Sequence, residues 1–224
     1  MLTSKQKRSV PNGLRRLPPQ LARQALLRIA GRRRIFERGE SAERIYLTFD
    51  DGPHPEYTPS LLDLLAQAQS RATFFVVGQA CERYPELLQR IVDEGHAVGN
   101  HSYFHHSPGL VTASQLKAEV IKTRDAIKRI SGRETSLFRP PYGALTLSKI
   151  AMLWGSGYQV ALWNVDPKDY SSTPAEVADW FASHPLQGQD VVLLHDVHAA
   201  AAAALPTVLE DLRRRGLSSA ALPA

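Results

Sequence analysis

The sequence of 224 residues has little cysteine, no long apolar run and no apolar leader. Its single cysteine, Cys81, excludes an internal disulfide and suits a reducing compartment. No stretch approaches the roughly 18 to 20 apolar residues that span a bilayer, and the first 40 residues lack the continuous apolar core of a secretory signal. We therefore expect a cytoplasmic protein, with the cell envelope or secretion as the alternative if translation starts upstream.

Positive charge is abundant only near the N-terminus. Residues 1–44 hold 12 Lys and Arg against 3 Glu, whereas the remaining 180 residues hold 15 basic and 19 acidic side chains. The body is therefore mildly acidic, and it has no basic stripe with interleaved aromatic residues of the kind that binds nucleic acid. We expect no nucleic-acid partner.

Residues 1–43 are predicted to form a basic leader that continues into a short amphipathic helix from Pro19. In the segment PQLARQALLRIAGRRR the apolar side chains fall on one helical face: Leu21, Ala22, Ala25, Leu26, Ile29 and Ala30. Such a helix either packs across the body or lies on an anionic membrane surface, because a basic amphipathic helix suits both uses.

Residues 44–224 alternate short apolar runs with helical patterns. The expected strands are Ile45–Phe49, Ala72–Val77, Ala97–Val98, Ser136–Phe138, Gln159–Trp163, Val191–Leu194 and, more weakly, Ser218–Leu222. The expected helices are Pro59–Ala68, Pro85–Asp93, Ala113–Ile130, Leu147–Gly155, Pro174–Ala182 and Leu205–Arg214. This alternation indicates crossover units and a mainly parallel sheet. The sequence therefore predicts an α/β fold, a distorted and incomplete (β/α) barrel of about seven units, with a doubly wound open sheet as the alternative.

Polar side chains gather directly after these strands. Asp50 and Asp51 follow the first strand, and GNHSYFHH, FRPPYG, WNVDPKDY and VVLLHD place further polar groups after the third to the sixth. The carboxyl ends of parallel strands converge on one face of an α/β barrel, where enzymes of this architecture hold their active sites. Because neighbouring strand residues point to opposite faces, Asp50 and Asp51 are suited to two different tasks.

His101 and His105 have the spacing of metal ligands. On a helical turn, residues four apart face the same way. Together with one strand-end carboxylate they form a three-ligand set for a divalent transition metal. Zinc is the expected metal, with cobalt, nickel or manganese as alternatives. The adjacent His106 is expected to point elsewhere.

Five segments, in the order TFDDGP, NHSYFH, RPPYG, DPKDY and LLHD, resemble the motifs of the polysaccharide deacetylases. This family is also called the NodB-homology domain or carbohydrate esterase family four. The resemblance covers about residues 44–222 and leaves out the basic arm. It implies a distorted barrel of about seven β/α units that removes acetyl groups from sugars with a bound divalent metal.

The resemblance also implies roles for individual residues. Asp51 would bind the metal together with His101 and His105, while Asp50 would be the general base that deprotonates the attacking water. Arg139 would pair with Asp50 and keep its carboxylate ionised.

The same resemblance implies that His195 is the general acid and that Asp166 orients its ring. The backbone N–H of Tyr142 would stabilise the oxyanion. Three residues would contact the substrate: Leu193, Pro141 and Tyr170. Tyr170 stands where the family usually has Trp, which leaves the shape of the acetyl or sugar subsite open.

The resulting prediction is a metal-dependent hydrolase that removes N-acetyl groups from an N-acetylglucosamine-containing glycan or chito-oligosaccharide. One alternative is an O-acetyl esterase on acetylated xylan or a related polysaccharide, because amide and ester cleavage need the same water, metal and acid. A second is a glycan-binding or scaffold protein without catalysis. A third gives the basic arm the task of tethering the enzyme to anionic lipid or to a partner. We expect a monomer.

Overall fold

The computed structural model describes residues 35–107 and 109–223. In this part of the chain a sheet runs in the order β1-β6-β5-β4-β3-β2-β7, and β8 pairs with β2. All of these strand pairs are parallel. The strands are β1 (Ile35–Phe36), β2 (Arg44–Asp50), β3 (Thr73–Val76), β4 (Ala97–Asn100), β5 (Leu137–Phe138), β6 (Gln159–Ala161), β7 (Val191–His195) and β8 (Ser218–Ser219).

The sheet curls into a barrel that is left incomplete between its edge strands, β1 and β7. The segment that follows β6 bridges part of this gap. The Leu193 N–H donates to the Val165 carbonyl at 2.9 Å, and the Asn164 N–H donates to the Val191 carbonyl at 3.2 Å. The predicted distorted and incomplete (β/α) barrel is therefore confirmed, and the doubly wound open sheet is excluded.

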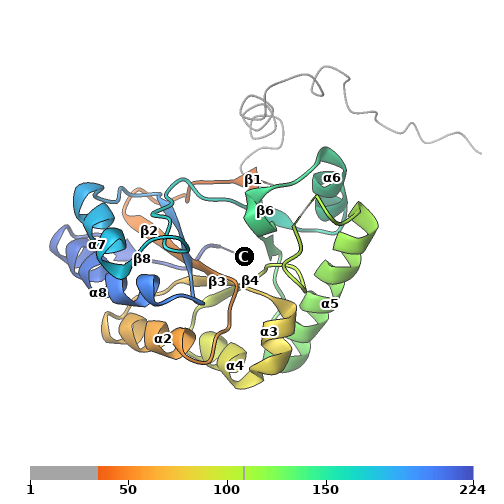
Figure 1. Cartoon of the computed structure of the whole chain (residues 1–224), viewed down its shortest axis with the longest axis horizontal. Helices are drawn as coiled ribbons and strands as arrows, with labels where there is room; N and C mark the ends of the chain where they lie inside the picture. Colours follow the sequence, from red (N-terminus) through yellow and green to blue (C-terminus); the bar gives the residue numbers. More distant parts are fainter. Residues whose placement is uncertain (1–34, 108, 224) are drawn as a thin grey trace, which may run out of the picture.

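Helices cover the outside of the curled sheet (Figure 1). They are α2 (Tyr57–Gln67), α3 (Gly78–Arg83), α4 (Pro85–Asp93), α5 (Ala113–Ser131), α6 (Leu147–Gly155), α7 (Pro174–Ser183) and α8 (Ala199–Arg214). The sequence did not predict the short elements α3 and β1. Helix α8 begins at Ala199 rather than at Leu205, because the alanine run that was expected to lead into the helix has high helix propensity and forms its first turns.

Alternation along β2 decides which side chains reach the barrel interior. Ile45, Leu47 and Phe49 belong to the core between sheet and helices. Tyr46 belongs to a separate cluster formed mainly by strand residues, inside the barrel. Because strand side chains alternate, Asp50 points to the same side as Tyr46. Burial of each large apolar side chain stabilises the fold by about 1.5 to 3 kcal/mol, and this packing fixes the direction of Asp50.

The sheet begins before the expected domain boundary at residue 44. Strand β1 pairs with β6 in a register that places Ile35 beside Val160. Residues 35–43 therefore contribute to the body and not only to a leader. The helix expected from Pro19 lies outside the described residues.

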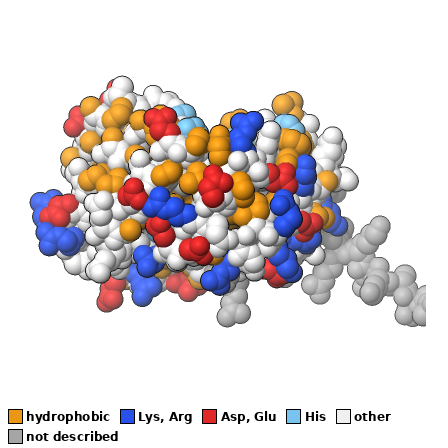
Figure 2. All heavy atoms as spheres, turned by 90° about the horizontal axis from the view of Figure 1, so that it is seen from below, with side chains coloured by type: hydrophobic (Ala, Val, Ile, Leu, Met, Phe, Trp, Pro, Cys, Tyr) orange, Lys and Arg blue, Asp and Glu red, His pale blue; other side chains and the backbone are white. Residues whose placement is uncertain are grey.

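The outer surface carries charges of both signs. Figure 2 shows Lys and Arg side chains mixed with Asp and Glu over one face of the molecule. Among the described residues, no helix combines the length and the apolar character needed to cross a membrane.

Candidate functional site

Three predicted metal ligands come together beyond the carboxyl ends of the strands. Ligand atoms of Asp51, His101 and His105 all lie within 4.8 Å of one another. Asp51 Oδ1 is 3.3 Å from His101 Nε2 and 3.1 Å from His105 Nε2. The structure thus assembles one carboxylate and two imidazoles from two separate segments of the chain.

Asp51 reaches this point through a left-handed backbone conformation, with φ of 79°. Strand β2 ends at Asp50, so Asp51 lies outside the strand. The alternation of strand side chains, which was expected to direct the two carboxylates to opposite faces, therefore does not apply to this pair. Asp50 Oδ2 also approaches His101 Nε2, at 3.7 Å. A non-glycine residue in such a conformation costs about 1 to 3 kcal/mol and persists only where its surroundings hold it. The loop is therefore shaped by tertiary contacts rather than by strand geometry.

Residues 101–106, called the His loop here, are not helical. Ser102 and His105 have positive φ values of 65° and 55°. The loop folds back on itself, and the His105 N–H donates to Ser102 Oγ at 3.1 Å. The prediction that a helical turn aligns the two imidazoles is therefore wrong. The rings of His101 and His105 instead meet through a strained loop, with centroids 5.0 Å apart.

The atoms around His101 fit a bound metal ion. His101 Nδ1 lies 2.7 Å from the Arg139 carbonyl oxygen, which only accepts hydrogen bonds, so Nδ1 carries the hydrogen. In the neutral ring the Nε2 lone pair then faces Asp51 Oδ1, a buried oxygen without a hydrogen-bond partner among the described residues. Two acceptors at 3.3 Å need a cation or a proton between them, and a divalent metal meets that need.

The pKa values of the three ligands follow from burial and from one another. Burial lowers the pKa of His101, but the Asp50 and Asp51 carboxylates outweigh it and raise the pKa above its ordinary value. Burial lowers the pKa of His105, which favours the neutral ring. Burial raises the pKa of Asp51, but the two histidines outweigh it and hold the pKa well below its usual range. Asp51 is therefore anionic.

Asp50 is held by a buried arginine. Arg139 Nη1 donates to Asp50 Oδ1 at 2.8 Å, and the two side chains are 0% and 4% exposed. Burying an unpaired charge costs several kcal/mol, so each member of this pair needs the other. The structure contains the predicted pair and places it in the interior of the protein.

Arg139 uses its other donors as well. Nη1 also donates to Thr48 Oγ1 at 2.6 Å, Nε donates to the Ala161 carbonyl at 3.3 Å, and Nη2 donates to the Leu162 carbonyl at 3.1 Å. Burial lowers the pKa of Arg139, although the neighbouring Asp50 carboxylate raises it. These contacts fix the guanidinium and, through it, the orientation of Asp50.

His195 pairs with Asp169 and not with Asp166. His195 Nδ1 lies 2.8 Å from Asp169 Oδ1, and the His195 N–H donates to Asp169 Oδ2 at 2.7 Å. Asp166 instead accepts from the Lys168 backbone N–H at 3.0 Å and from Lys168 Nζ at 2.6 Å. The predicted role of Asp166 is therefore wrong. Both aspartates stand in DPKDY, and the turn at Lys168, with φ of 60°, decides which one reaches the histidine.

The surroundings of His195 favour its protonated form. Burial lowers the pKa of His195, but the hydrogen bond and charge of Asp169, together with Asp50 and Asp51, raise it to about 9. In the sheet Asp50 and His195 are register partners on β2 and β7. Side chains of register partners point to the same face of a sheet. A carboxylate and an imidazolium therefore border the same space.

The turn at Pro141–Gly143 lies beside the His loop. Tyr142 has φ of 58°, the residue is 68% exposed, and its ring centroid is 4.9 Å from that of His105. Gly143 passes close to Trp163, and a Cβ at this glycine would approach the indole to 2.7 Å. Pro141, a predicted substrate contact, is buried. It offers little surface to a ligand and shapes the turn instead.

Leu193 and Tyr170 both lie near His195. Leu193 is buried on β7, two residues before His195 and on the same face of the strand. Tyr170 is 46% exposed, and its ring meets that of His195 edge-on with centroids 5.3 Å apart. These positions are compatible with contact to a substrate that reaches His195.

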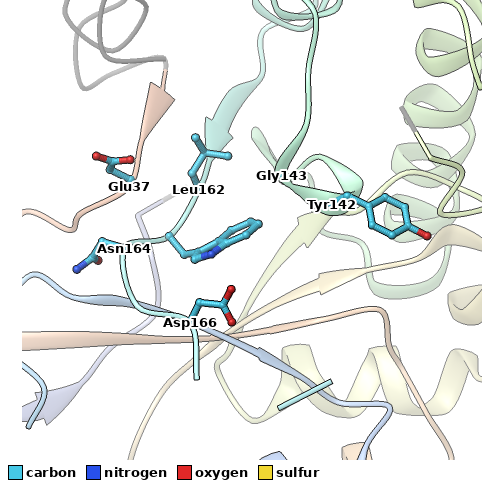
Figure 3. Close-up of a pocket in the computed structure, with 7 residues that line it drawn as sticks. Glu37, Tyr142, Gly143, Leu162, Asn164 and Asp166 are labelled. Atoms are coloured by element: carbon cyan, nitrogen blue, oxygen red, sulfur yellow. The ribbon is translucent and has the colours of Figure 1, made fainter. Parts of the chain in front are cut away.

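A cavity of about 540 Å³ adjoins the Tyr142 turn. Figure 3 shows Glu37, Asn164 and Asp166 around it, and the Tyr142 side chain points away from it. The lining residues are Glu37, Tyr142, Gly143, Leu162, Trp163, Asn164 and Asp166. Asp166 therefore belongs to the wall of this cavity.

Asp196 anchors the loop that carries Asp51, a role that the sequence analysis did not assign to it. Asp196 Oδ2 accepts from Thr58 Oγ1 at 2.6 Å, and the Asp196 N–H donates to the Asp50 carbonyl at 3.2 Å. A Cβ at Gly52 would approach the Asp196 carboxylate to 1.9 Å, so a side chain has no room there. Burial raises the pKa of Asp196 to about 7. In the sequence, the signal that could have identified Asp196 is its position directly after His195 in LLHD.

Comparisons with known proteins identify relatives of this chain. Residues 37–161 match the family model described as Polysaccharide deacetylase. A peptidoglycan-N-acetylglucosamine deacetylase of Bacillus cereus is 31% identical over 184 residues, which make up 80% of this chain and 66% of the relative. The peptidoglycan-N-acetylmuramic acid deacetylase PdaC of Bacillus subtilis is 36% identical over 176 residues, which make up 77% of this chain and 36% of the relative.

A solved structure shares the fold. It is that of the Bc1960 peptidoglycan N-acetylglucosamine deacetylase in complex with a substituted N-oxidanyl-benzamide. The TM-score is 0.79 at 29% sequence identity, and the match covers 84% of this chain and 90% of that chain. By contrast, this chain spans only about two thirds of the first sequence relative and about one third of the second.

Proposed function

Because this chain belongs to the polysaccharide deacetylase family, we propose that it is a metal-dependent hydrolase that removes N-acetyl groups from an N-acetylglucosamine-containing glycan or chito-oligosaccharide. The main support for the proposal is that Asp50 and His195, which are register partners in the sheet, lie beside a cluster of three side chains that could hold a metal: Asp51, His101 and His105. Hydrolysis of an acetamide needs a base, an acid and an electrophile at one point. These five side chains offer that combination.

Asp51, His101 and His105 would hold the metal ion. When bound, a divalent ion at this position lowers the pKa of a water molecule and polarises the acetyl carbonyl. Two imidazoles and one carboxylate accept zinc, cobalt, nickel or manganese, and zinc is our proposal. Three protein ligands also leave open positions for water and substrate.

Asp50 is suited to take up the proton of the attacking water. Arg139 occupies Asp50 Oδ1, which leaves Oδ2 near the ligand cluster, 3.7 Å from His101 Nε2. The guanidinium fixes the orientation of this carboxylate through the hydrogen bond from Nη1. As the water oxygen bonds to the acetyl carbon, its proton would pass to Oδ2.

His195 is suited to protonate the leaving amine. Asp169 engages Nδ1, so Nε2 is left for the substrate. The backbone N–H of Tyr142 would donate to the oxyanion that forms on the acetyl carbonyl. Cleavage of the C–N bond then releases acetic acid and an amine, which give acetate and an ammonium group when the acid passes its proton to the amine. The proton gained by Asp50 balances the proton that His195 gives up.

The names of the relatives favour an N-acetylated glycan as substrate. The relatives from Bacillus cereus and Bacillus subtilis are named for deacetylation of N-acetylglucosamine and N-acetylmuramic acid in peptidoglycan. The alternative of an O-acetyl esterase on xylan finds no support among these relatives. We therefore propose a glycan that contains N-acetylglucosamine as the substrate, in preference to acetylated xylan.

The test is acetate release by zinc-loaded protein. Chito-oligosaccharides and peptidoglycan strands serve as substrates, and acetylated xylo-oligosaccharides serve as the comparison. The parent should release acetate from the N-acetylated glycans. Asp50→Asn keeps the size of the side chain but removes the base, and should lower the rate by at least about 10²-fold. Asp125→Asn changes an exposed aspartate on α5 in the same way and serves as the matched control.

Two results would contradict the proposal. Acetate release from xylo-oligosaccharides alone would replace the N-deacetylase with an esterase. Full activity in Asp50→Asn would show that another group accepts the proton from water. The control variant should retain the parent rate, because its side chain lies on the outer surface of α5.

A further inference from the structure

Glu119 is a buried carboxylate on α5 that the proposed chemistry does not use. Its side chain is 10% exposed. Glu119 Oε2 accepts from the Tyr103 N–H at 3.3 Å and from the Phe104 N–H at 3.2 Å, while Oε1 lies 2.8 Å from His106 Nδ1. All of these partners belong to the His loop. The carboxylate therefore spans the stretch that separates the two histidine ligands.

The conformation of the His loop requires support from outside the loop. Two non-glycine residues, Ser102 and His105, have left-handed backbone conformations, which L-residues disfavour. Inside the loop the His105 N–H donates to Ser102 Oγ. The consecutive N–H groups of Tyr103 and Phe104 lie between these two residues and point to a single oxygen of Glu119. A buried anion is a strong acceptor for two such donors.

The same turn of α5 also holds the strand end that precedes the loop. Asn100 Nδ2 donates to the Val120 carbonyl at 2.9 Å, and Asn100 Oδ1 accepts from the Ser102 N–H at 3.0 Å. Glu119 and Val120 are neighbours in the helix. Helix α5 thus contacts the chain both before and after His101.

We propose that Glu119 is a positioning residue for the metal site, which holds the His loop so that His105 Nε2 meets the same point as His101 Nε2 and Asp51 Oδ1. The inference rests on the proposed metal-dependent function. The position of His105 depends on Glu119 more than the position of His101 does, because His101 is also held through Nδ1 by the Arg139 carbonyl. His105 is more exposed, at 26%, and its backbone is fixed through the loop.

The test measures binding of Co²⁺ and Zn²⁺ to the full chain after bound metal has been removed with a chelator. Glu119→Ala removes both acceptor oxygens and should raise the Kd of each ion by at least about tenfold, the usual effect of losing a partner that orients a ligand. It should also change the visible spectrum of the Co²⁺ form, which reports ligand geometry. Glu119→Gln keeps an oxygen for the two backbone N–H groups and should bind metal more tightly than Glu119→Ala.

Glu82, on α3, provides a matched control that also contacts the His loop. It accepts a hydrogen bond from the Tyr103 hydroxyl at 2.6 Å, and it pairs with Arg129 at 2.9 Å. It therefore contacts a loop side chain but not the loop backbone. Glu82→Gln should leave the Kd within about twofold of the parent, since loss of such a surface contact has little effect on free energies.

Three outcomes would overturn the inference. The first is a parent-like Kd and a parent-like Co²⁺ spectrum in Glu119→Ala or, if that variant does not fold, in Glu119→Leu, which also lacks the acceptor oxygens. The second is an equal loss of affinity in Glu82→Gln. The third is a parent that binds neither ion, which would also remove the metal-dependent function. A parent that binds metal but releases no acetate would contradict the proposed activity alone and leave the role of Glu119 to the binding data.

Discussion

Asp50 and His195 are register partners on neighbouring strands, yet their surroundings differ. The partner of Asp50 is Arg139, and the two side chains are 0% exposed for the arginine and 4% for the aspartate. The partner of His195 is Asp169, which is fully buried, while His195 itself is 12% exposed and borders Tyr170. The proposed base side of the site, formed by Asp50 and Arg139, is therefore part of the interior, whereas the proposed acid side, formed by His195 and Asp169, lies at its edge.

This difference shows how one site combines a fixed group with an accessible one. The base side joins three strands, because Arg139 also bonds to Thr48 and to the Ala161 carbonyl. Changing it disturbs both fold and chemistry. The acid side is a local contact between the end of β7 and the loop after β6, so changes there should alter chemistry more than stability.

The largest expected effect comes from Arg139→Met. It leaves the Asp50 carboxylate buried without its partner, and removal of one member of a buried ion pair costs about 3 to 5 kcal/mol. We expect that loss in the free energy of unfolding of the metal-free protein, measured with denaturant, together with loss of acetate release. Arg124→Met breaks an exposed pair with Asp125 and should cost less than about 1 kcal/mol. If Arg139→Met and Arg124→Met were equally stable, the buried pair would contribute no more to the fold than an exposed one. That result would contradict the description of the base side as part of the interior.

An intermediate effect is expected for Asp169→Asn. The pKa of His195 is about 9 in the metal-free protein. Without the Asp169 charge it should fall toward the ordinary value of 6.5, as measured by NMR titration. Because the folded-state pKa is raised, the pair stabilises the fold fully below pH 6.5, and this contribution is lost as pH rises through about 9.

The rate of acetate release should follow the same change. The limb at high pH should move to lower pH in Asp169→Asn, and the rate should fall about tenfold or more, because general acid–base catalysis contributes roughly 10² to 10⁴-fold. Asp166→Asn removes a carboxylate that pairs with Lys168 and should change neither the His195 pKa nor the high-pH limb. A shift in Asp166→Asn that matched the shift in Asp169→Asn would contradict the pairing described above.

The smallest effect is expected for Tyr170→Phe. Tyr170 meets the His195 ring edge-on with its own ring, and the substitution removes only the hydroxyl. Exposed substitutions usually change free energies by less than about 0.5 kcal/mol, so kcat/KM on chito-oligosaccharides should stay within about twofold of the parent. A loss in kcat/KM greater than tenfold would show that the Tyr170 hydroxyl contacts the substrate. The acid side of the site would then include this exposed residue.

Much of the fold follows from local pattern in the sequence. Short apolar runs such as Ile45–Phe49 predicted the strands, and the helical pattern over Ala113–Ile130 predicted α5. Two short elements, β1 and α3, were missed because a strand of 2 residues and a helix of 6 carry too little periodicity. The positions of the strand ends predicted where the candidate metal ligands would meet. They did not predict the backbone conformations that bring these side chains together.

The sequence by itself determined the order of the strands along the chain and the polar groups at their ends. These groups include the candidate metal ligands Asp51, His101 and His105. Tertiary structure decided which carboxylate meets His195, because Asp166 and Asp169 stand in one short loop and only its turn at Lys168 separates them. It also decided the left-handed conformations at Asp51 and in the His loop. Local propensity disfavours such conformations in L-residues, so contacts from distant elements must hold them.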